Sequence, residues 1–549
     1  MNSQQDRLAK QVLIQKSFES KRLFLTILRF AIPTFFFALF SAAYVFVDQI
    51  MVIKFVPHGP LNPDSIFTDQ ALIEEFKASA FYKGGDIPNH TELTASQLVK
   101  TVLNISQPIV VILNAITIFV PLGTGVIFSK TIGKGDEKKI KDAWNTGLVS
   151  TTLFALVTQI IVLAIAKEWL QFNLDKVDEQ HHVQVADQFQ HFFNEKAVAI
   201  GSEYVYILIG FNIIPMLSRL FFYLGQSEGR QLFIAIVPPL SNLLNVLFVF
   251  LLVRFSTLGV VGSAVAAILV YFITFMAYVV YLISLNKRGL TYLSLRDFSF
   301  KRVSFNLFLV ISMVGLASFF RNGSLSILNT FYESFLVNLT KTLTDQSDTF
   351  YLVLLTGPIA IANLTSAAIF GVLQGVRTVV SYKFGQGQLA DIKRINVYTL
   401  LVCLVFAALL YLILAVGLGK EILVHLFDTS AATLMLANQF SLIVQAQVFF
   451  VAIGATSQQY FQNTNRVLYS WIVSLMQGVI VFVPLLFIFQ AITLQTKNIE
   501  IFIWLLTANA ALAGLINVLI GQVHIHFFMD KYFAQKHKSR IVQFIERYS

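Results

Sequence analysis

Twelve long apolar stretches, separated by polar connections, constrain this chain more than any other feature of its sequence. An α-helix that crosses the hydrocarbon core of a bilayer needs about 20 predominantly apolar residues. Stretches of that kind cover residues 23–53, 103–129, 146–166, 201–224, 232–253, 258–285, 306–330, 350–382, 395–418, 434–461, 467–490 and 499–526. The sequence therefore predicts an all-α integral membrane protein with about twelve transmembrane helices.

The composition excludes a water-soluble fold. Charged residues make up 13% of the 549 residues and hydrophobic residues 56%, with a mean hydropathy of +0.70, whereas soluble domains carry about 25% charged residues. The one cysteine, Cys403, lies in an apolar stretch. A single thiol cannot form an intrachain disulfide framework, and a small buried or lipid-facing side chain is expected there.

The positive charges gather on one side of the predicted bundle. An even number of spans places both termini on the same side, and that side carries 25 Lys and Arg residues against 11 on the other. Because positively charged connections remain in the cytoplasm, we expect both termini to be cytoplasmic in a multi-pass protein of the cell membrane. The polar segment 1–22 does not resemble a cleavable signal peptide.

This distribution accounts for the net charge of +10 without a nucleic-acid partner. Nucleic-acid binding would favour aromatic residues interleaved with the basic ones. The most basic connection, residues 130–141, has none. The expected partners are the lipid bilayer and a small organic molecule, and a monomer is expected.

An internal repeat relates the two halves of the chain. The second and eighth apolar stretches end in motifs that match at a constant offset of 252 residues, Ser129, Gly133 and Gly135 corresponding to Ser381, Gly385 and Gly387. Both motifs leave the membrane on the same side, so the halves are expected to be parallel six-helix bundles, related by an axis along the membrane normal. Gly133 and Gly135 are expected to end the helix through positive φ angles.

The repeat predicts an N-lobe over 23–285 and a C-lobe over 306–526. A cytoplasmic linker, 286–305, joins them, and the cytoplasmic segment 1–22 and the basic tail 527–549 flank them. Two long outer loops, 54–102 and 167–200, belong to the N-lobe. The second contains His181, His182 and His191 beside acidic residues. A surface metal site is one interpretation, but a solvated helix is expected, with no bound metal.

One acidic residue lies deep in a predicted span. Asp48 is flanked by apolar residues on both sides in the first stretch, and ionisable groups at membrane depth are costly and usually functional. It is the candidate ion-coupling residue, carrying a proton or ligating Na⁺. The alternative is a carboxylate near the outer boundary that pairs with Lys54, six residues further on.

Other polar residues mark a candidate substrate path. Arg321 lies within the seventh stretch, either as an internal counter-ion or as a snorkelling arginine, whereas Arg219 and Arg377 are expected to snorkel toward the cytoplasm. Candidate cavity-lining residues in the fourth and fifth stretches are Asn212, Ser241, Asn242 and Asn245, which line a polar cavity or join helices by hydrogen bonds. Pro33 is the candidate hinge of the first helix. No catalytic constellation occurs, so an enzyme and a cofactor are not expected.

These residues resemble multidrug and toxic compound extrusion (MATE) transporters of the bacterial type. The resemblance rests on residues 28–33 followed by Asp48, on the two repeat motifs, and on Gly225 and Gly262. It implies two six-helix lobes in a V shape, antiport of organic cations driven by H⁺ or Na⁺, and Asp48 as the coupling aspartate. Asn245 stands where the family often has a second acid, and Arg321 stands where members that couple through the second lobe carry a glutamate. Coupling is therefore expected in the N-lobe.

The expected function is secondary active efflux by alternating access, with antiport of organic, amphipathic and cationic compounds. The alternative on a related two-lobe scaffold is a flippase of lipid-linked or amphipathic substrates, which a more cationic, lipid-accessible cleft favours. A membrane-embedded enzyme or a channel is a third class. An enzyme requires clustered catalytic groups at one depth, and the spans contain none.

Overall fold

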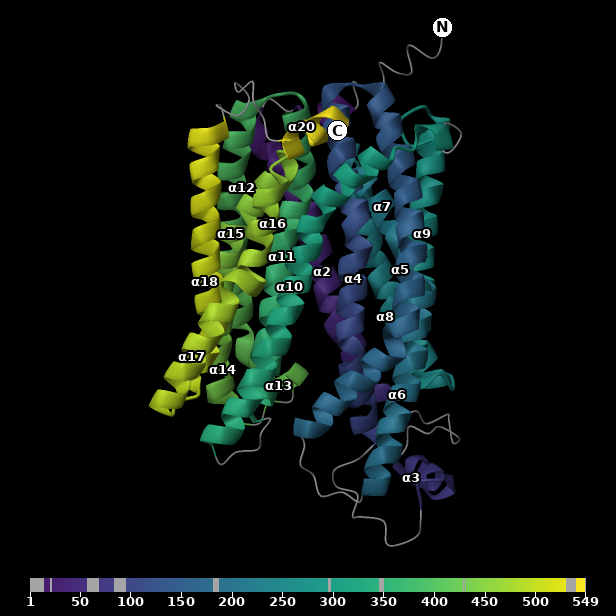
Figure 1. The fold of residues 1–549 in the computed structure, drawn as a ribbon, viewed down its shortest axis with the longest axis vertical. Helices are drawn as coiled ribbons and strands as arrows, with labels where there is room; N and C mark the ends of the chain where they lie inside the picture. Colours follow the sequence, from purple (N-terminus) through teal and green to yellow (C-terminus); the bar gives the residue numbers. More distant parts are fainter. Residues whose placement is uncertain are drawn as a thin grey trace.

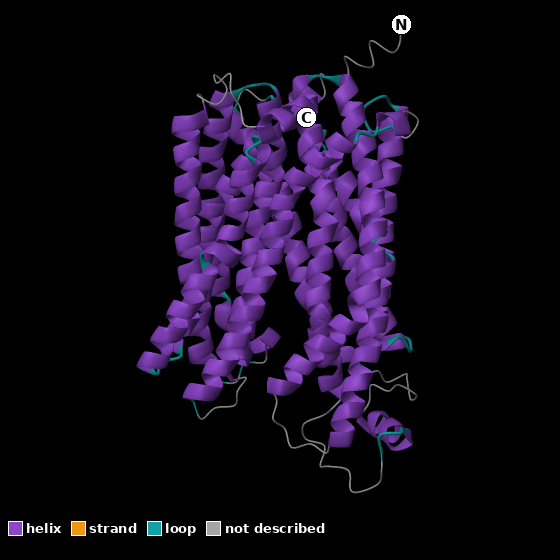
Figure 2. Cartoon of the chain, in the orientation of Figure 1, coloured by secondary structure: helices purple, strands orange, loops and turns teal. Residues whose placement is uncertain are grey.

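The computed structural model describes residues 14–19, 22–56, 69–82, 95–180, 187–294, 298–344, 350–427, 429, 431–529 and 540–548. Helices account for the secondary structure of these residues, which contain no strand (Figure 2). The N-terminal half consists of α2 (Leu23–Phe55), α3 (Asp69–Ala78), α4 (Ala95–Lys134), α5 (Glu137–Gln180), α6 (Asp187–Gly210), α7 (Ile213–Ser227), α8 (Gln231–Phe255) and α9 (Gly259–Lys287).

The C-terminal half follows the short 3₁₀ turn η1 (Phe300–Arg302). Its elements are α10 (Phe305–Leu343), α11 (Phe350–Gly385), α12 (Leu389–Leu410), the π-helical η2 (Tyr411–Gly417), α13 (Gly419–Phe427), α14 (Leu434–Gln445), α15 (Gln447–Asn463), α16 (Val467–Leu475), the π-helical η3 (Met476–Ile480), α17 (Phe482–Thr496), α18 (Glu500–Val523), the π-helical η4 (His524–Phe528) and α20 (Arg540–Tyr548).

The helix count agrees with the sequence prediction. Within the described residues, 11 helices are long and apolar enough to cross a membrane, and the number is 12 when the bent pair α6 and α7 is taken as one span. The two parts of that pair meet at an angle of 44°. The predicted all-α membrane fold is confirmed.

The helices form two lobes that follow the order of the sequence (Figure 1). Helices α2 to α9 form the N-lobe and α10 to α18 form the C-lobe, with α2 and α4 beside α10 and α11. The start of α2 and the C-terminal helix α20 lie at one end, which we call the termini end. Toward the opposite, distal end the ribbons of the two lobes spread apart.

Contacts between the lobes follow the internal repeat. Helix α2 corresponds to α10, and α4 corresponds to α11. The main contacts join α2 to α11 and α4 to α10, while α4 and α11 also touch each other. Exchanging the two halves converts the α2–α11 pair into the α10–α4 pair and leaves the α4–α11 pair unchanged. This is the contact pattern of parallel repeats related by an axis between the lobes.

Two glycines related by the repeat allow this close approach. A β-carbon on Gly123 of α4 would lie 2.1 Å from the Ile311 carbonyl oxygen of α10. A β-carbon on Gly375 of α11 would lie 2.2 Å from the Phe30 carbonyl oxygen of α2. Small residues let transmembrane helices approach closely and gain packing contacts, since lipid offers no hydrophobic drive for their association.

Some sequence-based boundaries are wrong in detail. The outer stretches 54–102 and 167–200 are not simple loops, because α3 and the start of α4 occupy part of the first, and the end of α5 and most of α6 occupy part of the second. His181 and His182 lie outside the described residues. The apolar faces of α3 and α6 pack against each other, with Phe76 in contact with Phe189 and Phe192.

The two glycines of the first repeat motif have different roles. Gly135 follows α4 with φ of +73° and its counterpart Gly387 follows α11 with φ of +74°, in the left-handed region that favours glycine. Gly133 lies inside α4, contrary to the expectation that it ends the helix. Its missing side chain serves packing, because a β-carbon there would lie 2.2 Å from the Tyr382 carbonyl oxygen.

Candidate functional site

A seam of polar side chains joins α2 and α8 inside the N-lobe. The Asn242 side-chain amide donates to Ser41 Oγ at 3.1 Å, and the Asn245 amide donates to Tyr44 OH. Asn242 and Asn245, three residues apart, share a helix face as the sequence predicts, and that face meets α2. Ser41 and Tyr44 were missed by sequence reasoning, because a hydroxyl within an apolar run carries no distinctive signal.

Asp48 stands one helical turn beyond Tyr44 on α2, but its side chain lies outside the described residues. Pro33 lies within α2, which continues through it as an α-helix. Asn212 lies at the bend between α6 and α7, where it is buried and its amide approaches Met216 Sδ at 3.7 Å. The structure therefore places Asn242 and Asn245 in one seam with α2, whereas Asn212 contacts its own span.

The seam gives a direct test of its role. Asn245→Ala removes the amide and should weaken the α2–α8 contact by about 0.6 kcal/mol, the average for hydrogen bonds between transmembrane helices. A seam that borders the substrate path also predicts a several-fold fall in transport. Thermal unfolding and transport by the purified protein measure the two effects. Ser241→Ala is the matched control on α8, because the Ser241 hydroxyl donates to Val237 of its own helix. Equal loss of transport in both variants would contradict a specific role for the seam.

Arg321 occupies the interior of the C-lobe. Its guanidinium donates to Gln458 Oε1 at 3.3 Å and to Asn322 Oδ1 at 3.4 Å, and it lies over the Phe370 ring at 4.3 Å. A small cavity of about 30 Å³ beside it is lined by further polar groups of α15, η3 and α18, among them Gln477 and Asn517. Of the two readings from sequence, the internal one fits these contacts, because amides and a ring face solvate the cation within the lobe.

A second arginine lies near the lobe interface. Arg377 of α11 is 7% exposed, so the expectation that it snorkels is wrong. Its guanidinium lies 5.7 Å from the Tyr223 ring of α7, and Gln374 donates to the Tyr223 hydroxyl at 2.7 Å. Within the described residues, the Arg377 Nε and Nη1 atoms have no hydrogen-bond acceptor. Arg321 lies close enough to interact electrostatically with both Arg377 and Tyr223.

The repeat motifs meet and close the termini end. The Ser129 hydroxyl donates to the Thr378 carbonyl at 2.9 Å, and the Ser381 hydroxyl donates to Asn463 Oδ1 at 2.7 Å. Lys130, which is buried, reaches Asn465 Oδ1 at 2.5 Å. The motif residues named from sequence thus come together, with Gly133 against Gly385, and they form a contact between the lobes.

The N-terminal segment contributes to the same closure. Glu19 accepts hydrogen bonds from Gln386 at 2.5 Å and from the Tyr382 hydroxyl at 3.4 Å. Burial alone would raise the pKa of Glu19, but the hydrogen bonds from Gln386 and Gln15 and the positive charge of Lys383 lower that pKa below its ordinary value. Glu19 therefore remains ionised at neutral pH and ties the N-terminal segment to the second repeat motif.

Comparisons with known proteins agree with this architecture. Residues 355–488 match the model of the MatE family. The uncharacterized protein MG447 of Mycoplasma genitalium is 68% identical over 549 residues, which cover 100% of both chains. Its homologue in Mycoplasmoides gallisepticum is 35% identical over 554 residues, covering 96% of this chain and 95% of its own.

Two solved structures share the fold over almost the whole chain. One is an outward-facing multidrug resistance MATE family transporter of the MOP superfamily, with a TM-score of 0.74 and 16% identity, covering 94% of this chain and 98% of its own. The other is a MOP superfamily transporter from Pyrococcus furiosus, described as having a binding pocket of reversed polarity, with a TM-score of 0.71 and 16% identity, covering 93% and 97%.

The chain is a multi-pass bundle of two parallel six-helix lobes that meet through repeat-related helices, and this is the fold of the solved MATE family transporter. The 68% identity over the whole length shows that the chain belongs to the same family as MG447. The MatE match over residues 355–488 agrees with the resemblance read from the sequence. In the described residues, no group of three or more His, Cys, Asp or Glu side chains is arranged to hold a metal ion.

Proposed function

We propose that this protein is a secondary active exporter that works by alternating access and exchanges an organic, amphipathic compound for H⁺ or Na⁺ at Asp48. It lies in the cell membrane as a monomer, with both termini in the cytoplasm and the lobes at 23–285 and 306–526. The termini end is then the cytoplasmic end, and the distal end faces outward.

The position of the lobe contacts carries this proposal. Four interface glycines lie in the halves of their helices nearer the termini end: Gly123 and Gly133 of α4, and Gly375 and Gly385 of α11. The same holds for the sites on α10 and α2 that Gly123 and Gly375 touch, whereas Gly133 and Gly385 bring α4 and α11 together. The ribbons spread at the distal end (Figure 1). A closed cytoplasmic end with separated distal ends is an arrangement that rocking of two rigid lobes would alternate with its opposite.

The polar seam supports coupling in the N-lobe. Position 48 follows the seam residue Tyr44 by one turn, and the chain has no acid at the second-lobe position, which Arg321 occupies. Protonation or Na⁺ binding at Asp48 would change the charge beside the α2–α8 contact. A change of that kind could bend α2 at Pro33 and close the N-lobe around its contents.

The second candidate is flipping or export of an amphipath with an anionic head group. The guanidiniums of the half-buried Arg321 and the buried Arg377, with Tyr223 near both, favour an anion over a cation at the base of the lobe interface. The Pyrococcus furiosus transporter with its pocket of reversed polarity offers a parallel for this chemistry. A cationic substrate would instead have to bind beside the N-lobe seam, away from both arginines.

A transport assay with the purified protein in vesicles separates these candidates. Proton and sodium gradients are imposed one at a time, with an amphipathic cation, an amphipathic anion and a fluorescent phospholipid as probes. Ion-driven efflux of an organic probe supports antiport and identifies the ion. Lipid translocation without any gradient supports the flippase, and continuous single-channel current in a planar bilayer would contradict both.

A further inference from the structure

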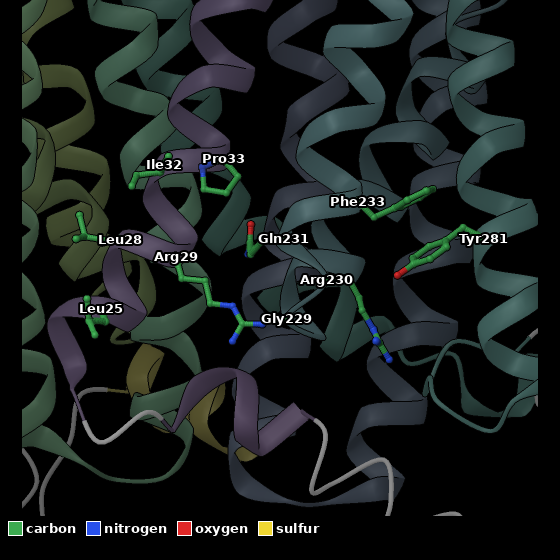
Figure 3. Close-up of a pocket in the computed structure, with 10 residues that line it drawn as sticks. All are labelled: Leu25, Leu28, Arg29, Ile32, Pro33, Gly229, Arg230, Gln231, Phe233 and Tyr281. Atoms are coloured by element: carbon green, nitrogen blue, oxygen red, sulfur yellow. The ribbon is translucent and has the colours of Figure 1, made fainter.

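A cavity of about 700 Å³ lies near the termini end of the N-lobe, away from the polar seam (Figure 3). Its walls come from the first turns of α2, the turn that joins α7 to α8, the first turn of α8, and one residue of α9. The lining residues include Arg29, Ile32, Pro33, Arg230, Gln231 and Tyr281. None of the lining residues is acidic, so two guanidinium groups set the charge of the cavity.

Arg29 interrupts an otherwise apolar stripe on the surface of α2. Leu25, Ile32, Phe36 and Phe40 are all more than a third exposed, and their spacing of three or four residues places them with the exposed Arg29 on one helix face. This stripe faces the surrounding membrane. A guanidinium on such a face is costly unless an anion pairs with it, and Arg29 lies only six residues, or about 9 Å, from the start of α2.

Two buried polar atoms in the wall of the cavity lack hydrogen-bond partners among the described residues. Arg230 donates to the Leu290 carbonyl through Nη2 at 2.9 Å, but its buried Nε has no acceptor among the described residues. Gln231 is 3% exposed and its buried Oε1 has no donor in the same part of the chain. Figure 3 shows the Arg29 side chain extending from α2 toward Gly229. The cavity thus combines cationic donors with neutral acceptors, among them Gln231 Oε1.

Apolar surface continues from this polar base toward the distal end. On α2 it consists of Ile32, Phe36 and Phe40, and on α8 of the exposed residues Ile236, Leu240 and Leu243. A ligand that satisfies the whole site needs an anionic group, a hydroxyl that can donate to Gln231, and long apolar chains. A soluble phosphate would leave the apolar wall uncovered, whereas a phospholipid covers it.

We propose that this cavity binds the head group of an anionic, hydroxyl-bearing phospholipid such as phosphatidylglycerol. Its phosphate lies between Arg29 and Arg230, its glycerol hydroxyl donates to Gln231, and its acyl chains run along α2 and α8. Pro33 lines the same cavity and has no N–H to donate to the carbonyl of Arg29. The lipid therefore contacts α2 at the turn where its backbone hydrogen bonding is weakest.

Lipid retention by the full-length protein tests the site without requiring transport. The purified protein in detergent is titrated with dioleoylphosphatidylglycerol, dioleoylphosphatidylcholine or glycerol 3-phosphate, and bound molecules are counted by native mass spectrometry. We expect one tightly held phosphatidylglycerol and at least about tenfold weaker binding of the other two probes. Arg29→Gln and Arg230→Gln should each weaken phosphatidylglycerol binding about tenfold, the change expected when a charge-assisted contact is lost.

Arg288→Gln is the matched control, because this exposed arginine at the same end of the molecule does not line the cavity. Ile32→Trp fills the rim without changing charge and should also displace the lipid, which keeps the test decisive if Arg230→Gln folds poorly. The proposal is overturned if Arg29→Gln and Ile32→Trp bind like the parent, if Arg288→Gln loses as much affinity, or if phosphatidylcholine or glycerol 3-phosphate binds equally well.

Discussion

Asp48→Asn is expected to weaken efflux driven by an ion gradient strongly while leaving the protein folded. The amide preserves the size of the side chain but can neither carry a proton nor hold Na⁺ as a charged ligand. Coupling between two sites in one protein is usually worth about 1–3 kcal/mol. Gradient-driven transport by the purified protein in vesicles should therefore fall about 5- to 150-fold.

The control for this substitution removes a carboxylate elsewhere. Asp142 of α5 lies near the termini end, where it approaches Arg302 at 3.7 Å, so Asp142→Asn changes the net charge equally without touching the N-lobe seam. It should retain coupled transport. If Asp48→Asn kept both proton-driven and sodium-driven efflux, Asp48 would not be the coupling residue and the proposed mechanism would be wrong.

Gly375→Ala and Gly123→Ala are expected to open the termini end. In each variant the new methyl group would lie about 2 Å from a carbonyl oxygen of the opposite lobe, a backbone atom that cannot turn away. Overpacking of this kind costs about 1–3 kcal/mol. It destabilises only the state in which the lobes are closed at the termini end. Each 1.4 kcal/mol shifts the ratio of closed to open molecules about tenfold.

A cysteine at Thr378 reports on this opening. Thr378 is buried, and its carbonyl accepts the hydrogen bond from Ser129 across the lobes, so a thiol reagent should label Thr378→Cys faster when the lobes separate. We expect about tenfold faster labelling in the alanine variants. The native Cys403 is buried, and the parent protein gives its background.

Gly323→Ala is the matched control, because a β-carbon on this α10 glycine meets no heavy atom within 4 Å. It should label like the Thr378→Cys parent. Unchanged labelling in folded Gly375→Ala and Gly123→Ala proteins would show that the glycine contacts do not hold the lobes together.

The sequence predicted the fold well because membrane insertion requires long apolar stretches, which are visible in the sequence directly. Each apolar stretch must be long enough to cross the hydrocarbon core, so the positions of α2, α4, α8, α9 and α11 could be recognised directly. The least accurate regions were the outer stretches, where α3 and the start of α6 are amphipathic and pack on each other rather than on lipid. Their lower hydropathy did not mark them as spans, so they were assigned to the outer connections.

The candidate site was only partly predictable. Asn242 and Asn245 could be found because amides are rare in apolar helices, but their partners Ser41 and Tyr44 lie 201 residues away in sequence. Arg377 was misjudged because its sequence position near a helix end suggests access to water, whereas α7 of the other lobe covers it. Which polar residue meets which depends on how helices pack.

By itself the sequence determined that this chain crosses a membrane about twelve times in two parallel halves, because span length, hydropathy and the 252-residue repeat are local or periodic properties. Only the tertiary structure decided that Gly133 packs rather than terminates a helix, that the Ser129 hydroxyl donates to the Thr378 carbonyl, and that Arg29 borders a cavity of the N-lobe. Those facts depend on distances between separate helices, and interhelical packing sets these distances through contacts that no local pattern encodes.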